Sequence, residues 1–198
     1  MNHIIRLAKI VDSEKILKIY EPYVTNTAIS FEIDVPALNE FENRIEKIIS
    51  KYPFIVYEID KCIIGYAYSS QHRERAAYGY NVEVSIYLLP EFHGKGIACK
   101  LYDCLFKFLE KLGYINAYAT YAEPNIKSMK FHQKFGFSTV GTFKKTGYKF
   151  GQWHDVTWLH KTISENSIPK KTLGINEISS DYLDRIFSDW HHCTEHHF

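Results

Sequence analysis

The sequence of 198 residues has few cysteines and no long apolar run. Its four cysteines are Cys62, Cys99, Cys104 and Cys193, and no two of them form a CxxC pair. This usage argues against a disulfide scaffold, and we expect free thiols in a reducing cytoplasm. Because no apolar run is long enough for either, we expect no signal peptide and no membrane span, and we predict no membrane partner.

The chain also lacks a strong charge of either sign. Lys and Arg number 24, Asp and Glu number 23, and the formal net charge is +1. Binding to nucleic acid would require a local basic patch, because the overall charge provides no attraction, and we predict no nucleic-acid partner. Hydrophobic residues make up 45% and aromatic residues 16%, which argues against disorder. The length predicts one domain with an appendage.

The residue pattern predicts a mixed α/β chain without internal repeats. Apolar and β-branched runs indicate strands, and apolar residues at helical spacing indicate helices. We expect strands over 4–8, 54–59, 62–68, 80–89 and 115–121, and two long strands within 137–162 around a turn from Gly147 to Gly151. We expect helices capped by Asp12 or Ser13, after Pro36, over 94–112 and over 124–135.

The composition changes after residue 163. Ser164 and the residues after it are typical of a linker, and 178–190 predicts a weakly amphipathic helix. We therefore divide the chain into a domain over 1–163 and a C-terminal extension over 164–198. The extension ends in His191, His192, His196 and His197, a spacing that could bind zinc on a helix. Because the cluster lies at the terminus, after the last core element, we interpret it as a tail and predict no metal.

A glycine-containing loop joins a predicted strand to the longest predicted helix. The strand ends at Pro90, and His93-Gly94-Lys95-Gly96 leads into the helix. Unpaired amides and the helix dipole make such a loop suitable for a pyrophosphate, and Lys95 adds positive charge. Gly94 and Gly96 let the backbone approach the anion closely. The third glycine of a dinucleotide fingerprint is absent, and an ordinary turn into a helix is the alternative interpretation.

Two sequence blocks resemble one enzyme family. His93-Gly94-Lys95-Gly96-Ile97-Ala98 is similar to the acyl-CoA pyrophosphate loop of GNAT N-acetyltransferases, with His93 where Arg or Gln is usual. The block from Asn125 to Phe137 is similar to the family's helix after the fifth strand. Further blocks resemble the phosphinothricin acetyltransferase branch, and together they span roughly residues 4–162: Thr27-x-x-Ser30-Phe31-Glu32, Arg75-x-x-Tyr78, Val82-Glu83-x-Ser85-x-Tyr87 and Gly147 to Val156.

The resemblance implies a fold and a reaction. The fold is a twisted, mixed, mostly antiparallel sheet whose central parallel strands splay apart to admit acetyl-CoA. The reaction moves the acetyl group of acetyl-CoA to the α-amine of a small amino acid or analogue, such as phosphinothricin or methionine sulfoximine. A homodimer is implied as well. A protein N-terminal acetyltransferase and a non-catalytic acyl-CoA-binding module are the alternatives.

The resemblance also assigns the residues that bind acetyl-CoA. A backbone N–H at Ile86 or Tyr87 is the expected donor to the oxyanion, and Asn125 is expected to cap its helix, to contact the pantetheine arm, or to do both. The full set implied for acetyl-CoA is Ile86, Tyr87, Leu88, His93, Gly94, Lys95, Gly96, Ile97, Ala98 and Asn125.

Glu83 is the candidate general base. It stands in an otherwise apolar strand, and burial beside a cleft would raise the pKa of its carboxyl group toward a useful value. The alternatives are a solvent-facing residue or a structural ion pair. His132 stands where many family members have Tyr, and two roles stay open for it: a proton donor to the leaving thiolate, or a packed structural histidine.

Phe31, Arg75 and Tyr78 match positions of the acceptor pocket in this branch. Arg75 could bind an amino-acid carboxylate through two hydrogen bonds, although the polar loop from Gln71 to Arg75 could equally be a solvated surface. Trp153, His154 and Asp155 resemble a second wall of the pocket or a dimer contact, and core packing is the alternative for Trp153.

Overall fold

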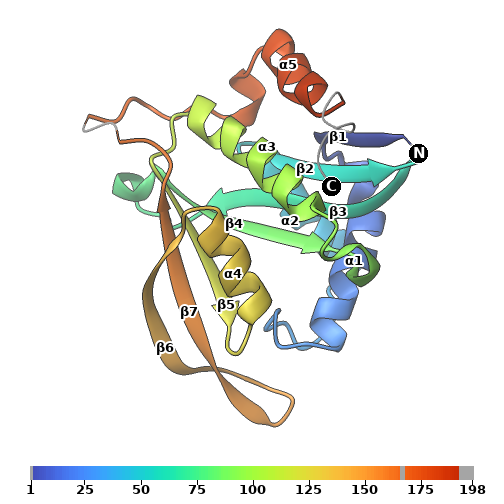
Figure 1. Cartoon of the computed structure of the whole chain (residues 1–198), viewed down its shortest axis with the longest axis vertical. Coiled ribbons are helices and arrows are strands. Elements are labelled where there is room, and N and C mark those ends of the chain that lie inside the picture. Colours follow the sequence, from blue (N-terminus) through green and yellow to red (C-terminus); the bar gives the residue numbers. More distant parts are fainter. Residues whose placement is uncertain (1, 166–167, 192–198) are drawn as a thin grey trace.

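The computed structural model describes residues 2–165 and 168–191, and its centre is one mixed sheet. The strands follow the order β1-β2-β3-β4-β5-β7-β6, and among the neighbouring strands of the described residues only β4 and β5 run parallel to each other (Figure 1). The predicted mixed, mostly antiparallel sheet is confirmed. Its strands are β1 His3–Leu7, β2 Phe54–Ile59, β3 Cys62–Gln71, β4 Asn81–Leu88, β5 Asn116–Ala122, β6 Ser138–Lys149 and β7 Gln152–Thr162.

Helices cover both faces of the sheet. Phe41 and Ile45 of α2 and Ile16 and Ile19 of α1 form one apolar cluster with β2 and β3. The apolar side of α3 forms a second cluster on the other face, with Val82 of β4 among its strand residues. The helices are α1 Ser13–Thr25, α2 Leu38–Ile49, α3 Ile97–Lys111, α4 Ile126–Lys134 and α5 Ser180–His191.

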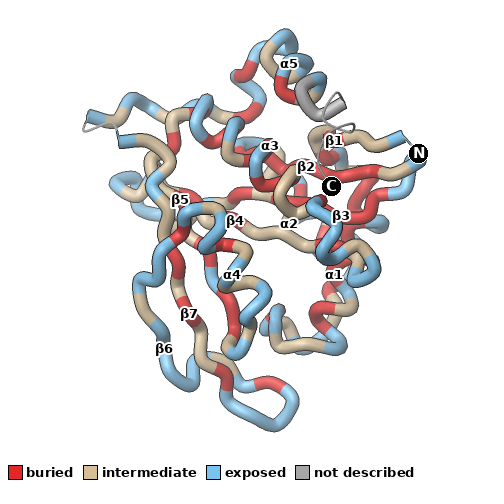
Figure 2. The backbone as a smooth tube through the Cα atoms, in the orientation of Figure 1, coloured by how far each residue is buried: buried red, intermediate tan, exposed pale blue. Residues whose placement is uncertain are grey.

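The core is concentrated around α3 and the central strands, whereas β6 is mostly exposed (Figure 2). The apolar stripe predicted for the long helix is confirmed, because each of its members is at most 5% exposed. Burial of these side chains is the main free-energy gain that fixes α3 against the sheet. The stripe consists of Ile97, Leu101, Cys104, Leu105, Phe108, Leu109 and Leu112.

The parallel strands β4 and β5 separate partway along their length. Their pairing runs only from Asn81 opposite Asn116 to Glu83 opposite Tyr118. Beyond that pair β4 continues to Leu88, paired with β3 alone, and β5 continues paired with β7. The splay predicted from the family resemblance is therefore present, and it begins at Glu83.

Asp12 stands at the start of α1 but does not cap it. Its carboxylate accepts hydrogen bonds from the Arg6 guanidinium and from the backbone N–H of Lys9. Ser13 donates its hydroxyl hydrogen to the carbonyl of Ile10 and makes no cap either. The predicted side-chain cap is wrong because Arg6, on β1, binds the Asp12 carboxylate more strongly than a backbone amide does.

The β6–β7 hairpin is fastened to the segment between α1 and α2. The Lys149 ammonium donates to the carbonyl oxygens of Val24 at 2.6 Å and Ser30 at 2.7 Å. The Phe31 ring lies so close to Gly147 that a Cβ there would stand 2.4 Å from it. These contacts draw the loop that contains Phe31 and Glu32 over the β4 side of the sheet.

The C-terminal extension packs on the domain. Ile175, Ile178 and Ile186 are buried in the cluster around α3, and the Phe187 ring lies 5.6 Å from that of Phe108. The extension therefore adds to the core of the domain and covers part of β1 and α3. His192, His196 and His197 of the predicted histidine cluster lie outside the described residues.

Across 2–165 and 168–191, no helix is long and apolar enough to cross a bilayer. Within the same described ranges, no three His, Cys, Asp or Glu side chains come together as a possible metal site. The three cysteines that the structure describes, Cys62, Cys99 and Cys104, are free thiols.

Candidate active site

Alternate residues of β4 face opposite sides of the sheet. Val82, Val84 and Leu88 belong to the cluster beneath α3, whereas Tyr87 packs with the α1 and α2 side. Because side chains alternate along a strand, Glu83 and Ser85 share the face of Tyr87. Glu83 therefore projects, at the point where the strands part, onto the face covered by the loop between α1 and α2.

The Glu83 carboxylate is partly enclosed and hydrogen-bonded. Its side chain is 35% exposed, and Oε1 lies 3.0 Å from Nδ1 of His72. Burial raises the pKa of Glu83, and the His72 hydrogen bond and the charges of His72 and Arg73 partly oppose that rise. A carboxylate with a raised pKa in this position fits a group that accepts a proton.

Aromatic rings surround His72. Its imidazole stacks on the Tyr118 ring, with centroids 4.3 Å apart and an interplanar angle of 12°. Trp158 and Tyr78 present their rings edge-on to it at 5.8 and 6.2 Å. The loop after β3 is thereby held against β5 and β7, across the start of the splay.

A cavity of about 560 Å³ lies beside this cluster. The Arg73 guanidinium stands 5.4 Å from the centre of the Tyr78 ring at its wall. The cavity has one cationic side chain and several aromatic rings, which suits a small molecule with a carboxylate. Its lining is His72, Arg73, Tyr78, Tyr118, Val140, Gly141, Thr142, Phe143 and Trp158.

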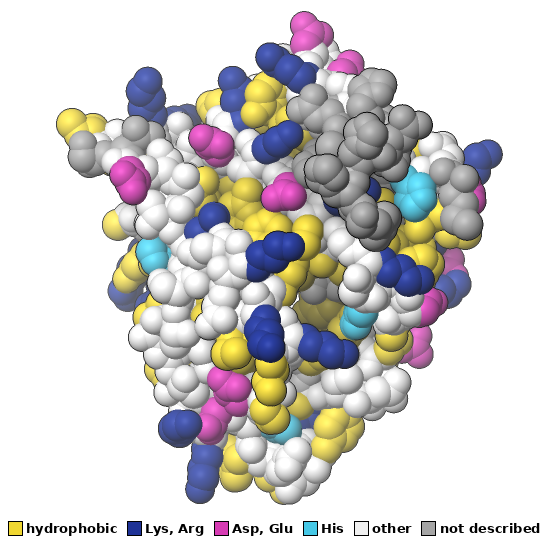
Figure 3. Space-filling model, in the orientation of Figure 1, with side chains coloured by type: hydrophobic (Ala, Val, Ile, Leu, Met, Phe, Trp, Pro, Cys, Tyr) yellow, Lys and Arg dark blue, Asp and Glu magenta, His cyan; other side chains and the backbone are white. Residues whose placement is uncertain are grey.

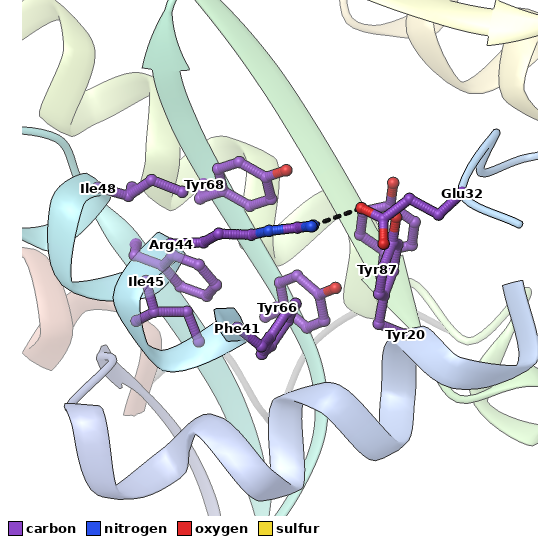
Figure 4. A pocket seen from close by; sticks show the side chains of 10 residues that line it. Tyr20, Glu32, Phe41, Arg44, Ile45, Ile48, Tyr66, Tyr68 and Tyr87 are labelled. Atoms are coloured by element: carbon purple, nitrogen blue, oxygen red, sulfur yellow. Dashed lines mark hydrogen bonds and ion pairs between the residues drawn. The ribbon is translucent and has the colours of Figure 1, made fainter. Parts of the chain in front are cut away.

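A smaller cavity of about 100 Å³ lies on the same face of the sheet, toward α1 and α2 (Figure 4). Four tyrosines line it, and the Arg44 side chain extends across it to an ion pair with Glu32. Arg44 also pairs with Glu40, so two carboxylates neutralise one guanidinium. Its lining is Tyr20, Glu32, Phe41, Arg44, Ile45, Ile48, Phe54, Tyr66, Tyr68 and Tyr87.

The splay leaves backbone groups of β4 without a neighbouring strand. Leu89 donates its N–H to the carbonyl of Ile64 near the start of β3. Because N–H groups alternate in direction along a strand, those of Ile86 and Leu88 point away from β3 into the gap, and that of Tyr87 points toward β3. The Tyr23 hydroxyl lies 3.4 Å from the Leu88 nitrogen and donates to the Leu88 carbonyl.

The loop before α3 presents a row of amides. In the described chain, no N–H from Gly94 to Cys99 donates to a protein acceptor, and no side chain caps the helix. Gly94 and Gly96 have φ values of 76° and 75°, and a Cβ at either would meet nothing within 4 Å. Left-handed backbone, free amides and open space beside a helix N-terminus fit a diphosphate.

The face of the molecule with α3 and α4 is hollowed near its middle, with Lys and Arg side chains around the hollow (Figure 3). His93, at the start of the loop, is hydrogen-bonded through Nε2 to the Tyr23 hydroxyl at 2.9 Å. This contact ties the loop to α1 and to the end of β4, because the same hydroxyl donates to the Leu88 carbonyl.

His132 is enclosed within α3 and α4. It is 5% exposed, its Nδ1 lies 2.9 Å from the Ser128 carbonyl, and its Nε2 lies 3.0 Å from the Tyr102 hydroxyl. Burial lowers the pKa of His132, so the neutral ring donates to Ser128 and accepts from Tyr102. Both nitrogens are engaged by the protein, which favours the structural role of the two that the sequence left open.

Asn125 caps α4, since its side-chain oxygen accepts the Ser128 N–H at 3.0 Å. Tyr78 lies with His72 and Glu83, but Arg75 and Phe31 are not in the lining of either cavity. Trp153 packs on Tyr148, and Asp155 pairs with Lys144, so both lie at the hairpin and not at Glu83. His154 is buried, with Nε2 3.2 Å from the Lys149 carbonyl.

Four residues around Glu83 were not predicted from the sequence: His72, Arg73, Tyr118 and Trp158. His72 and Arg73 belong to the loop from which Arg75 was proposed as the carboxylate-binding residue, and the position of that loop could have identified them. The loop joins β3 to β4, the strand that carries Glu83, so its polar and aromatic residues could all have been treated as candidates for contact with Glu83.

Comparisons with known proteins agree with this geometry. Residues 5–158 match the family model described as an acetyltransferase (GNAT) domain. The chain is 27% identical to a phosphinothricin N-acetyltransferase of Streptomyces viridochromogenes, covering 88% of this chain and 95% of that protein. It is 29% identical to an L-methionine sulfoximine/L-methionine sulfone acetyltransferase of Salmonella typhimurium, covering 83% and 97%.

A solved structure is also similar. The crystal structure of a GNAT superfamily phosphinothricin acetyltransferase from Sinorhizobium meliloti in complex with AcCoA superposes with a TM-score of 0.82. The two chains are 32% identical, and the match covers 90% of this chain and 98% of that one.

Proposed function

The chain belongs to the GNAT acetyltransferase family and is an acetyl-CoA-dependent N-acetyltransferase, and we propose that its acceptor is the α-amine of a small amino acid or analogue, with Glu83 as general base. The observation that carries this proposal is the position of Glu83, a carboxylate of raised pKa at the start of the splay. Phosphinothricin and methionine sulfoximine are the acceptors that the names of similar proteins suggest.

The proposed role of Glu83 is to remove a proton from the acceptor's amine at neutral pH. At neutral pH an α-amine is mostly present as the protonated ammonium form, which has no free electron pair for attack. Glu83 takes its proton, directly or through one water, and the neutral amine attacks the thioester carbonyl carbon. The new N–C bond forms, the C–S bond breaks, and coenzyme A leaves as a thiolate, which needs no protein proton donor. Acetyl-CoA supplies the activated acetyl group as a thioester. The Ile86 N–H, which points into the gap, is the donor that we assign to the oxyanion.

The loop before α3 holds the coenzyme in this proposal. The amides from Gly94 to Cys99 bind its diphosphate, and Lys95 adds positive charge. The pantetheine arm follows the open edge of β4 past Ile86 toward Leu88, whose backbone groups the Tyr23 hydroxyl contacts, and Asn125 orders the start of α4 on the other side of the gap. His132 has no proton-transfer role, since both of its nitrogens are bound within the protein.

Arg73 is the residue that we assign to the acceptor carboxylate. It lines the larger cavity, next to the His72 that contacts Glu83, and its guanidinium can bind a carboxylate through two hydrogen bonds. Arg75 belongs to the same loop and, like Arg73, is exposed, but it lies outside the lining of this cavity. Arg73 thus takes the place that the sequence analysis gave to Arg75.

The smaller cavity is the place for the acceptor's side chain. Glu83 and Ser85 stand between the two cavities, because Tyr68 pairs with Ser85 and His72 contacts Glu83. The cavity is aromatic, and its single cation, Arg44, is already neutralised by Glu32 and Glu40. Such a site favours an unbranched, uncharged side chain with a polar end, such as a sulfone or sulfoximine, over an anionic phosphinate.

We also propose a homodimer formed through the β6–β7 hairpin. β6 is the edge strand of the sheet, and five large side chains of this hairpin are more than half exposed. Exposed apolar side chains gathered on one hairpin are typical of a surface that a partner covers. They are Val140, Phe143, Tyr148, Phe150 and Trp153. Sedimentation equilibrium tests this, and a dimer that Trp153→Lys converts to monomer is the expected result.

A thiol-release assay with acetyl-CoA and a panel of acceptors tests the function. We expect turnover with methionine sulfoximine, methionine sulfone and phosphinothricin, and a higher kcat/KM for the two uncharged side chains. Turnover with peptides alone would instead support a protein N-terminal acetyltransferase. Saturable acetyl-CoA binding without release of thiol for any amine would support a non-catalytic binding module.

A further inference from the structure

We propose that His72 is a positioning residue for the reaction, which holds the Glu83 carboxylate in place through Nδ1 at the point where β4 and β5 part. This inference rests on the proposed role of Glu83 as general base. It assigns a function to a side chain that neither the family resemblance nor the sequence pattern singled out.

The geometry fixes the imidazole on both sides. Nδ1 lies 3.0 Å from Oε1 of Glu83, and the ring stacks on Tyr118 with centroids 4.3 Å apart. The His72 side chain is only 8% exposed. Because Glu83 and Tyr118 are the last paired residues of β4 and β5, His72 spans the start of the splay and contacts both strands.

The hydrogen bond has a defined direction while Glu83 is charged. An ionised carboxylate only accepts, so Nδ1 carries the shared hydrogen and donates it. The bond stabilises the carboxylate and leaves Oε2 available for the proton of the acceptor. Without it, Glu83 would be free to turn about its side-chain torsions, and its orientation toward the acceptor would be lost.

Several other groups face this pair. Arg73 follows His72 in the loop, Tyr78 lies on η2 (Ala76–Tyr78), and Tyr118 and Trp158 project from β5 and β7. Burial and, to a smaller extent, the charge of Glu83 raise the pKa of the Tyr68 hydroxyl on β3. The His160 ring of β7 lies 5.2 Å from the Tyr118 ring. Arg73 is the permanently charged cation of this group. Like His72, it lowers the pKa of Glu83 and so favours the ionised carboxylate.

Two substitutions separate the hydrogen bond from the ring. His72→Phe keeps an aromatic ring over Tyr118 and removes the donor. His72→Asn removes the ring and keeps a donor, because the Asn side-chain nitrogen takes nearly the position of Nδ1. The pH dependence of kcat/KM is measured for both variants and for the unaltered enzyme, with methionine sulfoximine throughout, so that the acceptor's own ionisation is common to all. Thermal melting checks that each variant is folded.

Loss of the donor destabilises the charged form of Glu83 and raises the pKa of its carboxyl group. We therefore expect the acidic limb for His72→Phe to move upward by about one pH unit, while that of His72→Asn stays near the original. Equal limbs for all three proteins, or equal shifts for both variants, would overturn the proposal. Glu83→Gln, measured alongside, separates the proposed role of His72 from the proposed role of Glu83. If Glu83→Gln retains full turnover, Glu83 is not the base.

Discussion

Glu83 and Tyr118 form the last residue pair that β4 and β5 share. Up to this pair the two strands exchange backbone hydrogen bonds. Beyond it, toward their C-terminal ends, β4 is paired with β3 only and β5 with β7 only. A carboxylate of raised pKa, a stacked imidazole and an open strand edge thus meet at one level of the sheet. The chemistry that we propose follows from this meeting point.

The loop before α3 gives the first prediction. Gly96→Ala forces a side chain onto a left-handed backbone at φ 75°, which costs about 1–2 kcal/mol. If the loop relaxes to avoid that cost, its amides move, and the Kd for acetyl-CoA rises by about 5- to 30-fold. Calorimetric titration with acetyl-CoA measures this.

Gly151→Ala is the matched control. Gly151 has the same φ of 75°, also has open space where a Cβ would stand, and lies in the β6–β7 turn. It should lower stability without changing the Kd for acetyl-CoA. An equal loss of affinity in both variants would show that the loop geometry is not what binds the coenzyme.

The two arginines of the loop after β3 give the second prediction. Arg73→Gln should raise the KM for the acceptor by about tenfold to hundredfold, because the carboxylate loses a charged hydrogen-bond partner. Arg75→Gln removes the same charge from the same loop, two residues away, and should leave that KM nearly unchanged. Steady-state kinetics with methionine sulfoximine decides between them, and the reverse ranking would return the carboxylate to Arg75.

His132 gives a prediction about stability and pH. Burial lowers the pKa of its imidazole in the folded state. Below about pH 6.5 the imidazole therefore binds a proton more readily in the unfolded chain than in the folded chain. Stability therefore falls as pH decreases through that range. Urea unfolding at pH 7.5 and 5.5 should show a smaller loss for His132→Gln than for the unaltered protein.

The same variant tests the role of His132 in the reaction. Because its ring nitrogens bind Ser128 and Tyr102, His132→Gln should keep both limbs of the pH profile of kcat/KM. A lost basic limb in a folded variant would mean that the ring donates a proton after all.

Much of the fold could be predicted because it is set locally. The continuous β-branched and aromatic runs of β2 and β3 and the positive-φ turn at Asp60 and Lys61 define that hairpin. The apolar stripe of α3 is continuous and entirely buried. The glycines before α3 mark a backbone that other residues adopt only with strain, so the loop was also visible in the sequence.

Contacts between distant segments could not be predicted. The sequence around Asp12 does not show that its carboxylate binds the Arg6 guanidinium. It also does not show that Glu58, from a distant strand, binds the same guanidinium. The stack of His72 on Tyr118 joins residues 46 positions apart, and it exists only because β5 lies beside β4 in the sheet. The same distance explains why Arg73 could not be distinguished from Arg75 until the loop was placed.

The most direct test of the proposed chemistry is the turnover of Glu83→Gln, with Glu74→Gln, an exposed residue of the neighbouring loop, as its control. We predict that Glu83→Gln binds acetyl-CoA with unchanged affinity and that its kcat/KM with methionine sulfoximine falls by about 10²- to 10⁴-fold. Glu74→Gln should match the unaltered enzyme. Full acetyl transfer by a folded Glu83→Gln variant, with the same pH dependence as before, would contradict the assignment of this carboxylate as the base.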